Sequence, residues 1–255
     1  MTDALTASEV FELAHRDLPR QAPGSAATTR LLLGLAGPLP DRPRIVDIGC
    51  GTGVASLLLA AETGGEVTAV DVHQPFLDRL AADAAAAGLA GRVRPLRASM
   101  QDLPLPAAGA DLLWAEGSAY LMGFDAALRA WRPLLAPGGA LVLTEAEWTT
   151  VDPSPGARAF WDPGYPGMRS TAGNVAAAMA AGWTVAAGYL LPDSDWAAYY
   201  DPLAERVARL RERGVDPAAL DEVAAEIEVR RAHGHEYGYT GYVLRPGGGS
   251  VGPGR

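Results

Sequence analysis

The segment Val46-Asp47-Ile48-Gly49-Cys50-Gly51-Thr52-Gly53 constrains the fold of this chain more than any other. A short β-branched run ends in it, three alternating glycines follow, and an apolar helical run begins at Val54. Glycine suits such a turn because it adopts positive φ angles and lets another group approach the main chain closely. The N-terminus of the following helix directs amide groups at the same point. The pattern predicts a strand, a ligand-binding turn and a helix.

Strands and helices alternate from residue 44 to residue 145, which predicts βαβ units and therefore a parallel sheet with helices on both faces. Apolar residues at helical spacing predict helices after the first and second strands and before the fifth. We expect strands over 44–48, 66–70, 93–96, 110–114 and 140–144, and helices over 54–62, from 74 onward and over 124–135.

The two ends of the chain extend this core. The first 40 residues predict two short helices, with Ser8 and Ser25 as N-caps. Residues 146–170 are too aromatic for a solvent loop and too rich in proline for a helix. Beyond them we expect a helix over 171–181, a strand over 183–191, two helices up to about residue 233 and a closing strand over 237–244.

The expected fold is therefore a doubly wound, Rossmann-like α/β domain with a seven-stranded sheet whose last strand is antiparallel. N-terminal helices and C-terminal helical and loop additions are expected to form a lid. We interpret residues 1–246 as one domain followed by a flexible tail. Its parts are a helical lid (1–40), a cofactor-binding core (41–146), a substrate-side elaboration (147–235), a final strand (236–246) and the tail (247–255).

Charge and composition exclude several classes of partner. The chain has 21 basic and 30 acidic residues, a net charge of -9, which repels phosphate backbones and anionic membranes. We therefore expect neither nucleic-acid nor membrane binding.

The first residues lack the layout of a signal peptide and no apolar run is long enough to span a bilayer, so a cytoplasmic location is expected. Cys50 is the sole cysteine, and no clustered metal ligands are evident, so no metal is expected.

Two further residues restrict the kind of ligand that this turn can bind. Asp71 ends the second predicted strand, where a carboxylate can hold both hydroxyls of a ribose. In a dinucleotide-binding motif the third glycine stands one position after that of Gly53, and this chain has Val54 at that position. The spacing thus favours a ligand without a pyrophosphate.

The segment DIGCGTG, followed by a strand ending in VDV, resembles motifs I and II of the class I S-adenosylmethionine-dependent methyltransferases. Residues 99–104, 111–114 and 134–139 resemble the later landmarks of that superfamily, so the resemblance covers about residues 44–145. More loosely, residues 20–25, 114–118 and the YGYTGYV strand resemble a bacterial subgroup of small-molecule-type methyltransferases with unassigned substrates.

The resemblance implies S-adenosylmethionine as the cofactor. It places the glycines against the methionine moiety, Asp71 on the ribose, Met100 and its neighbours at the adenine, and Ala115 at the methionine end. Many relatives have Asp where this chain has Ser99, so Gln101 or Asp102 is an alternative contact for the adenine. The implied cofactor residues are Asp47, Gly49, Cys50, Gly51, Gly53, Asp71, Val72, Ser99, Met100, Gln101, Ala115, Gly24 and Ser25.

Candidates for the methyl acceptor lie after the fourth and fifth strands. Methyl transfer needs in-line approach, and a base only when the nucleophile keeps its proton. Glu116, Glu145 and His15 are the candidate catalytic residues, each with a purely structural role as the alternative. The aromatic residues of the late chain predict either core packing or an acceptor pocket. The candidate substrate-binding residues are Glu116, Tyr120, Trp148, Trp161 and Tyr165.

The predicted function is methyl transfer to an O, N or C nucleophile of a small molecule, with secondary metabolites as one class of acceptor. Methylation of RNA or protein, a non-catalytic S-adenosylmethionine-binding protein and a nicotinamide oxidoreductase are the alternatives. The oxidoreductase is disfavoured by Val54 and by the absence of lysine from the chain, because the typical Tyr-x-x-x-Lys pair cannot form. A homodimer is left open.

Overall fold

A twisted sheet runs through the computed structural model, which describes residues 6–16 and 18–247. The strand order is β3-β2-β1-β4-β5-β8-β7, and β8 is antiparallel to both of its neighbours. A two-residue strand, β6 (Arg169–Ser170), adds to β5. The seven strands of the main path are β1 (Arg44–Ile48), β2 (Glu66–Asp71), β3 (Val93–Arg97), β4 (Ala110–Ala115), β5 (Leu135–Trp148), β7 (Trp183–Leu190) and β8 (Tyr237–Pro246). The predicted fold class is confirmed.

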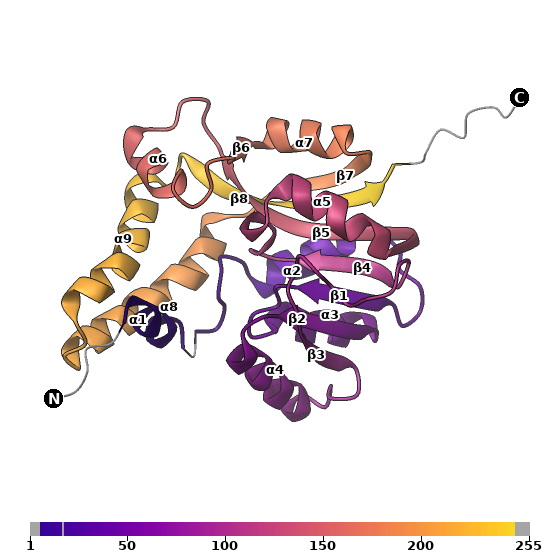
Figure 1. Cartoon of the computed structure of the whole chain (residues 1–255), viewed down its shortest axis with the longest axis horizontal. Coiled ribbons are helices and arrows are strands. Elements are labelled where there is room, and N and C mark those ends of the chain that lie inside the picture. The colour runs from indigo at the N-terminus through magenta and orange to yellow at the C-terminus, as the bar shows by residue number, and fades with distance from the viewer. Residues whose placement is uncertain (1–5, 17, 248–255) are drawn as a thin grey trace, which may run out of the picture.

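Helices cover both faces of the sheet (Figure 1). One face packs against α2 (Ala26–Leu35), α3 (Val54–Thr63) and α4 (Gln74–Ala86) through a buried, mainly aliphatic cluster. The other packs against α5 (Phe124–Trp131) and α7 (Thr171–Ala180). The apolar strands are buried on both sides, as a parallel sheet requires.

A separate helical layer stands beyond the carboxyl end of β5 (Figure 1). It contains α1 (Ala7–His15), α6 (Pro155–Trp161), α8 (Asp193–Glu212) and α9 (Pro217–His233), and α1 packs on both α8 and α9. Its core is aromatic: the Trp196 ring lies 4.9 Å from that of Tyr239 and 5.6 Å from that of Tyr237. Within the described residues, no helix is both long and apolar enough to cross a membrane.

Three local predictions were wrong. Helix α1 is capped by Thr6, not Ser8, because Thr6 and Glu9 form a reciprocal capping box. The helix expected to run to residue 135 ends at Trp131, and a 3-10 turn, η2 (Arg132–Leu134), leads directly into β5. Residues 155–161 do form a helix, because Ser154 caps it and Pro155 occupies the first turn, where a missing N–H is harmless.

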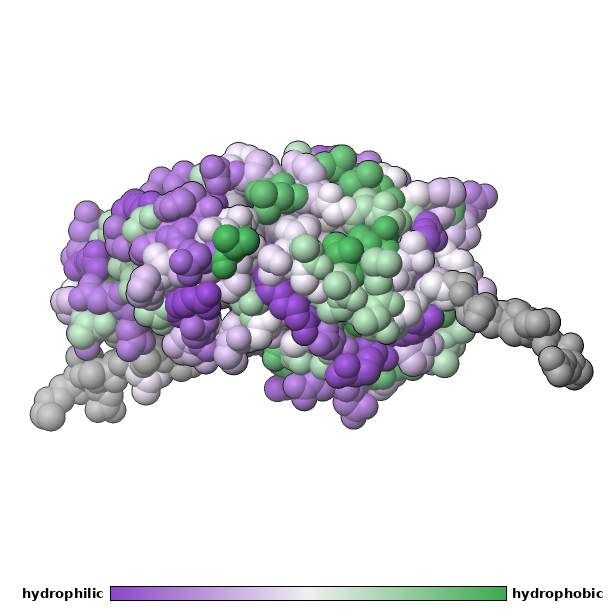
Figure 2. Space-filling view, turned by 90° about the horizontal axis from the view of Figure 1, so that it is seen from above, coloured by the Kyte–Doolittle hydropathy of each residue, from purple (hydrophilic) through white to green (hydrophobic). Residues whose placement is uncertain are grey.

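The outer face above α6 and α7 is mixed in character. Hydrophobic residues gather there in several patches separated by hydrophilic ones (Figure 2). Single exposed apolar side chains are normal on a folded surface. This face therefore gives no argument for a homodimer, which stays a prediction. Of the tail expected over 247–255, residues 248–255 lie outside the described residues.

Candidate functional site

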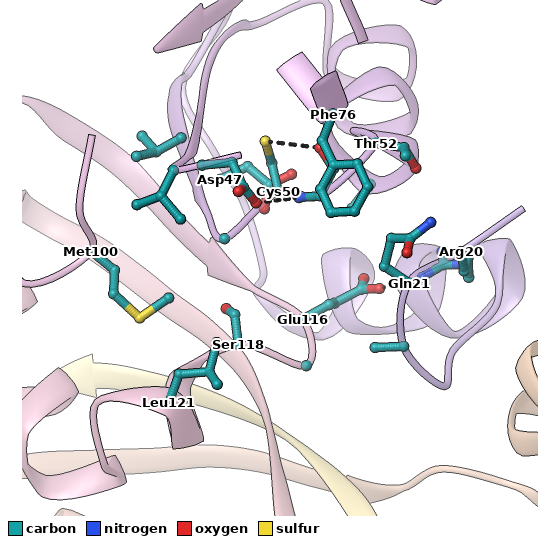
Figure 3. A pocket seen from close by; sticks show the side chains of 18 of the residues that line it. Arg20, Gln21, Asp47, Cys50, Thr52, Phe76, Met100, Glu116, Ser118 and Leu121 are labelled. Carbon is teal, nitrogen blue, oxygen red and sulfur yellow. Dashed lines mark hydrogen bonds and ion pairs between the residues drawn. The ribbon is translucent and has the colours of Figure 1, made fainter. Parts of the chain in front are cut away.

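A cavity of about 410 Å³ opens at the carboxyl ends of β1, β2 and β4 (Figure 3). Open α/β sheets bind ligands at this edge, and the volume falls in the range of small-molecule sites, roughly 300–1,000 Å³. The loops after these strands line the cavity together with residues 20–23. Of the predicted site residues, it brings together His15, Asp47, Gly49, Cys50, Gly51, Asp71, Val72, Ser99, Met100, Gln101, Glu116 and Tyr120.

The glycine loop is fixed against both neighbouring strands. The backbone N–H groups of Gly49 and Cys50 both donate to the Val70 carbonyl, at 2.8 and 2.9 Å. On the other side, the Ser118 hydroxyl donates to the Ile48 carbonyl at 2.7 Å. A Cβ at Gly49, which has φ +73°, would lie 2.5 Å from that of Ser118. Gly49 is therefore required for the loops after β1 and β4 to meet.

Asp71 links the glycine loop to the loop after β2. One carboxylate oxygen accepts the Gly51 N–H and the other accepts the His73 N–H, each at 2.9 Å. Asp71 also lines the cavity. Each oxygen keeps a further lone pair, so the carboxylate can accept hydrogen bonds from a ligand without releasing the loop.

Asp47 is a buried carboxylate on the wall of the cavity. It accepts a hydrogen bond from the Ser56 hydroxyl at 2.6 Å and is 1% exposed. Burial raises the pKa of Asp47 to about 7, and the nearby negative charges of Glu116 and Asp71 add to the rise. A cation bound in the cavity would favour the ionised form of this group.

Glu116 forms an ion pair with Arg20 at 2.7 Å, and both side chains are largely buried. Its second oxygen accepts from the Thr29 hydroxyl at 2.7 Å and from the Trp114 indole N–H at 3.0 Å. Glu116 thereby joins the loop after β4 to the N-terminal segment. These contacts favour an anchoring role over that of a free base.

His15 and Tyr120 also line the cavity. His15 is 3% exposed, and its Nε2 lies 3.0 Å from the Tyr199 hydroxyl of α8. Tyr120 belongs to the 3-10 turn η1 (Ala119–Leu121). The Gln21 amide donates to the His15 carbonyl at 3.2 Å. The first helix thus contributes a wall of the cavity, while its movement as a lid stays a prediction.

The other predicted site residues lie outside the cavity lining. Gly24 and Ser25 adjoin it: the Gly24 N–H donates to the Asp195 carbonyl, and Ser25 caps α2. Ala115 is buried in the sheet core. The remaining members, Glu145, Trp148, Trp161 and Tyr165, are buried or half-buried around β5 and α6, next to or within the aromatic core of the helical layer.

Gly53 is also outside the lining, and its surroundings indicate a packing role. It has φ +81°, and a Cβ there would lie 2.1 Å from Cδ1 of Leu80 in α4. We expect Gly53→Ala to lower the free energy of unfolding by about 2–4 kcal/mol, from the left-handed backbone and overpacking together. Chemical denaturation should show this loss.

Gly138 provides the matched control, because it also has φ +81° but no atom within 4 Å of its added Cβ. Gly138→Ala should cost only the backbone part, about 1–2 kcal/mol. Equal losses for the two variants would contradict the packing role of Gly53.

Sequence reasoning missed several cavity residues. Arg20 and Gln21 lie in the segment whose loose resemblance had pointed to Gly24 and Ser25, and Ser118 directly follows Glu116 and Gly117. No periodicity marks such loop positions, so the chain neighbours of predicted residues were the available signal. The missed lining residues are Arg20, Gln21, Ala22, Pro23, Thr52, Val54, Ala55, Val70, Phe76, Ala98, Gly117, Ser118 and Leu121.

No group of three or more His, Cys, Asp or Glu side chains within the described ranges is arranged to hold a metal ion.

The whole fold is shared with solved methyltransferases. A S-adenosylmethionine-dependent methyltransferase from Geobacter sulfurreducens, crystallised with S-adenosyl-L-homocysteine, superposes with a TM-score of 0.81 at 19% identity, covering 95% of this chain and 99% of that one. Fold and cavity therefore define the class I, Rossmann-like methyltransferase architecture. Residues 45–139 match the family model described as a methyltransferase domain. In fold and in this matched segment the chain is similar to the class I S-adenosylmethionine-dependent methyltransferases.

Curated relatives resemble the core of the chain. Dimethylglycine N-methyltransferase of Parasynechococcus marenigrum is 35% identical over 125 residues, which are 49% of this chain and 45% of that protein. The 27-O-demethylrifamycin SV methyltransferase of Amycolatopsis mediterranei is 36% identical over 120 residues, 46% of this chain and 44% of that protein. The chain thus matches a little under half the length of these relatives.

Proposed function

We propose that this protein transfers a methyl group from S-adenosylmethionine to an O, N or C nucleophile of a small molecule. The observation that carries the proposal is the cavity itself. It joins a close-approach glycine loop, the Asp71 carboxylate and the Arg20–Glu116 ion pair at one sheet edge. The curated relatives named above are both methyltransferases named for small molecules, dimethylglycine and 27-O-demethylrifamycin SV.

The charges of the cavity fit this cofactor. Three carboxylates, Asp47, Asp71 and Glu116, line it, whereas its basic side chains among the described residues are His15 and Arg20. A cavity with an excess of negative charge favours a ligand that carries sulfonium and ammonium cations. The Arg20–Glu116 pair presents one charge of each sign, which complements the carboxylate and ammonium of an amino-acid group.

A pyrophosphate fits the same cavity poorly. Val54 is the first residue of α3, and it lines the cavity at the helix N-terminus, where a dinucleotide would place its phosphates. The three carboxylates would also repel a dianionic group. This geometry supports a methyltransferase over an oxidoreductase.

The side chains act by holding and orienting the reactants. S-Adenosylmethionine supplies a methyl group bonded to a positively charged sulfur, which an aligned nucleophile can attack directly. In this assignment Asp71 holds the ribose, the loop around Gly49 and Gly51 seats the methionine part, and Gly117 and Tyr120 face the acceptor. Alignment alone accounts for several orders of magnitude in rate. Glu116 is not assigned as the base, because Arg20, Thr29 and Trp114 already occupy its carboxylate.

The activity can be tested by release of S-adenosylhomocysteine from S-adenosylmethionine in the presence of panels of small amines, phenols and hydroxylated ketones. Acceptor-dependent release with at least one panel is the expected result. Two outcomes would overturn the proposal. If the protein binds S-adenosylhomocysteine but no panel gives release of S-adenosylhomocysteine from S-adenosylmethionine, a non-catalytic cofactor-binding protein is favoured. If transcribed RNA or peptides are better acceptors than the small molecules, the acceptor is not a small molecule.

A further inference from the structure

His15 is a buried histidine that also forms part of the cavity wall. It lies in the last turn of α1, is 3% exposed, and is one of the residues that line the cavity. Its Nε2 lies 3.0 Å from the hydroxyl of Tyr199 in α8. Histidine changes its protonation state readily near neutral pH. The cavity wall therefore includes a group that can exchange a proton with a bound ligand.

Gln21 connects His15 to the glycine loop. Its side-chain amide donates to the His15 carbonyl at 3.2 Å, and its Cγ would lie 3.5 Å from a Cβ placed on Gly51. In our assignment the loop around Gly51 seats the methionine part of the cofactor. A single side chain thus spans from the backbone of His15 to the part of the cavity where the methyl group is expected.

The same cavity has aromatic and apolar surface for an acceptor. Tyr120 and Leu121 of η1 both line it. Leu121 is a large apolar side chain and is nevertheless 63% exposed, so it lies where the cavity meets solvent. Small-molecule sites combine such surface with a few polar groups that fix the orientation of the ligand. Here the ring of Tyr120 and the side chain of Leu121 offer the surface, and His15 offers a polar group.

The charges of the cavity restrict the acceptor further. Arg20, the arginine of the lining, is already paired with Glu116 at 2.7 Å, so an anionic acceptor would meet mainly carboxylates. The same carboxylates would keep an amine in its ammonium form, whose nitrogen has no lone pair for attack. A neutral compound with a hydroxyl group avoids both problems.

We propose that His15 is the general base for a neutral aromatic acceptor with a weakly acidic hydroxyl group, a phenol, whose ring packs on Tyr120 and Leu121. The inference rests on the proposed function, because it names the acceptor class and the base for that same reaction. The O–H bond of the acceptor breaks, its electron pair stays on the oxygen, and the proton passes to the imidazole nitrogen that carries none. The oxygen takes the methyl group, neutral S-adenosylhomocysteine leaves, and the imidazolium later loses its proton to solvent.

Tyr199 is suited to hold the imidazole in both protonation states. Burial, followed by the charge of Glu226 and the neighbouring Tyr120, raises the pKa of Tyr199 far above its ordinary value, so its hydroxyl keeps its proton. A phenolic hydroxyl can donate to Nε2 or accept from it. His15 therefore stays oriented before and after the transfer. Arg206 of α8, which donates to the backbone of α1, is a further charged group on the elements packed against this helix.

The proton transfer can be observed with 4-nitrophenol, whose ionised form is yellow and whose neutral form is not. The probe is titrated near pH 6 into protein saturated with S-adenosylhomocysteine, and its absorbance is recorded. We expect the ratio of ionised to neutral probe to be at least about tenfold higher for the bound than for the free probe, a shift of about one pKa unit. His15→Gln should bind the probe in its neutral form, because glutamine cannot take up the proton.

Two further variants complete this experiment. Tyr199→Phe keeps the imidazole but removes the hydroxyl that orients it, so it should lower the ratio of ionised to neutral bound probe by about three- to tenfold, the effect of one hydrogen bond. His235→Gln is the matched control, because His235 is an exposed histidine that does not line the cavity. It should give the wild-type spectrum.

Rates of S-adenosylhomocysteine release from S-adenosylmethionine separate a base from a structural residue. Near pH 8, 4-nitrophenol is largely ionised already, whereas 4-methoxyphenol is neutral and needs a base. General-base catalysis contributes about 100- to 10,000-fold, so His15→Gln should lower kcat with 4-methoxyphenol by at least about 100-fold and with 4-nitrophenol by less than about tenfold. A structural role would lower both rates equally.

Several outcomes would overturn the inference. Neutral bound 4-nitrophenol in the wild-type protein, an ionised probe in His15→Gln, or equal losses of rate with the two phenols would overturn the role of His15. Release with amines and none with phenols, or no binding of 4-nitrophenol, would overturn the acceptor class and leave the proposed function intact. Unchanged binding of S-adenosylhomocysteine by the variants shows that they are folded. Failure of the wild-type protein to bind S-adenosylhomocysteine would instead overturn the proposed function.

Discussion

Replacing Asp71 by alanine is expected to weaken the binding of S-adenosylhomocysteine by about 100-fold or more. The carboxylate holds the Gly51 and His73 backbone N–H groups, and in our assignment it also holds the ribose hydroxyls. Hydrogen bonds to a charged group contribute about 1.5–3 kcal/mol each, so losing two or more of them corresponds to about 3–6 kcal/mol. Calorimetric titration of the purified variant measures the loss.

Asp78→Ala is the control for this substitution. Asp78 is an exposed carboxylate of α4 that accepts a hydrogen bond from the Gln74 side chain, and it does not line the cavity. Its removal should leave the affinity unchanged. If Asp71→Ala bound S-adenosylhomocysteine as well as Asp78→Ala does, the cofactor site would have to be placed elsewhere.

Glu145→Gln is expected to stabilise the protein at alkaline pH. The pKa of Glu145 is raised from about 4.5 in the unfolded chain to about 8 in the folded one. Between these values the folded state binds more protons, so the free energy of unfolding falls as pH rises from 4.5 to 8. Glutamine has the same shape without the charge. We expect the variant to match the wild-type protein near pH 5 and to exceed it by about 2–4 kcal/mol at pH 8.5.

Urea denaturation across this pH range measures the difference. Part of the fall in the free energy of unfolding with rising pH should persist in the variant, because the pKa of Asp47 is also raised, to about 7. Glu147→Gln provides a contrast: it places an amide N–H₂ among three donors and should destabilise the protein at every pH by about 1–3 kcal/mol. A pH-independent difference between Glu145→Gln and the wild-type protein would show that Glu145 is already ionised in the folded state.

The core of the site was predictable because its signals are local in sequence. A strand, three glycines and a helix within ten residues require a turn with positive φ angles, and the structure has them at Gly49, Gly51 and Gly53. Asp71 was predictable for the same reason, since the end of a parallel strand fixes which sheet edge a side chain occupies.

The remaining features depend on contacts between distant segments. The sequence does not indicate that Arg20 reaches Glu116, 96 positions away, or that His15 meets Tyr199, 184 positions away. Gly53 looked like its neighbours in the motif, yet its packing against Leu80 depends on how α4 crosses the loop. The burial of Glu145 beside Tyr165 likewise depends on how residues 155–168 fold back toward β5. Hydrophobic periodicity carries no information on these contacts.

The most direct test of the central claim is a calorimetric titration of the wild-type protein with S-adenosylmethionine, S-adenosylhomocysteine and NAD(H). The negatively charged cavity and the position of Val54 predict micromolar binding of both adenosyl compounds and no binding of NAD(H). Binding of NAD(H) alone, or of none of the three, would contradict the assignment of this cavity as the S-adenosylmethionine site.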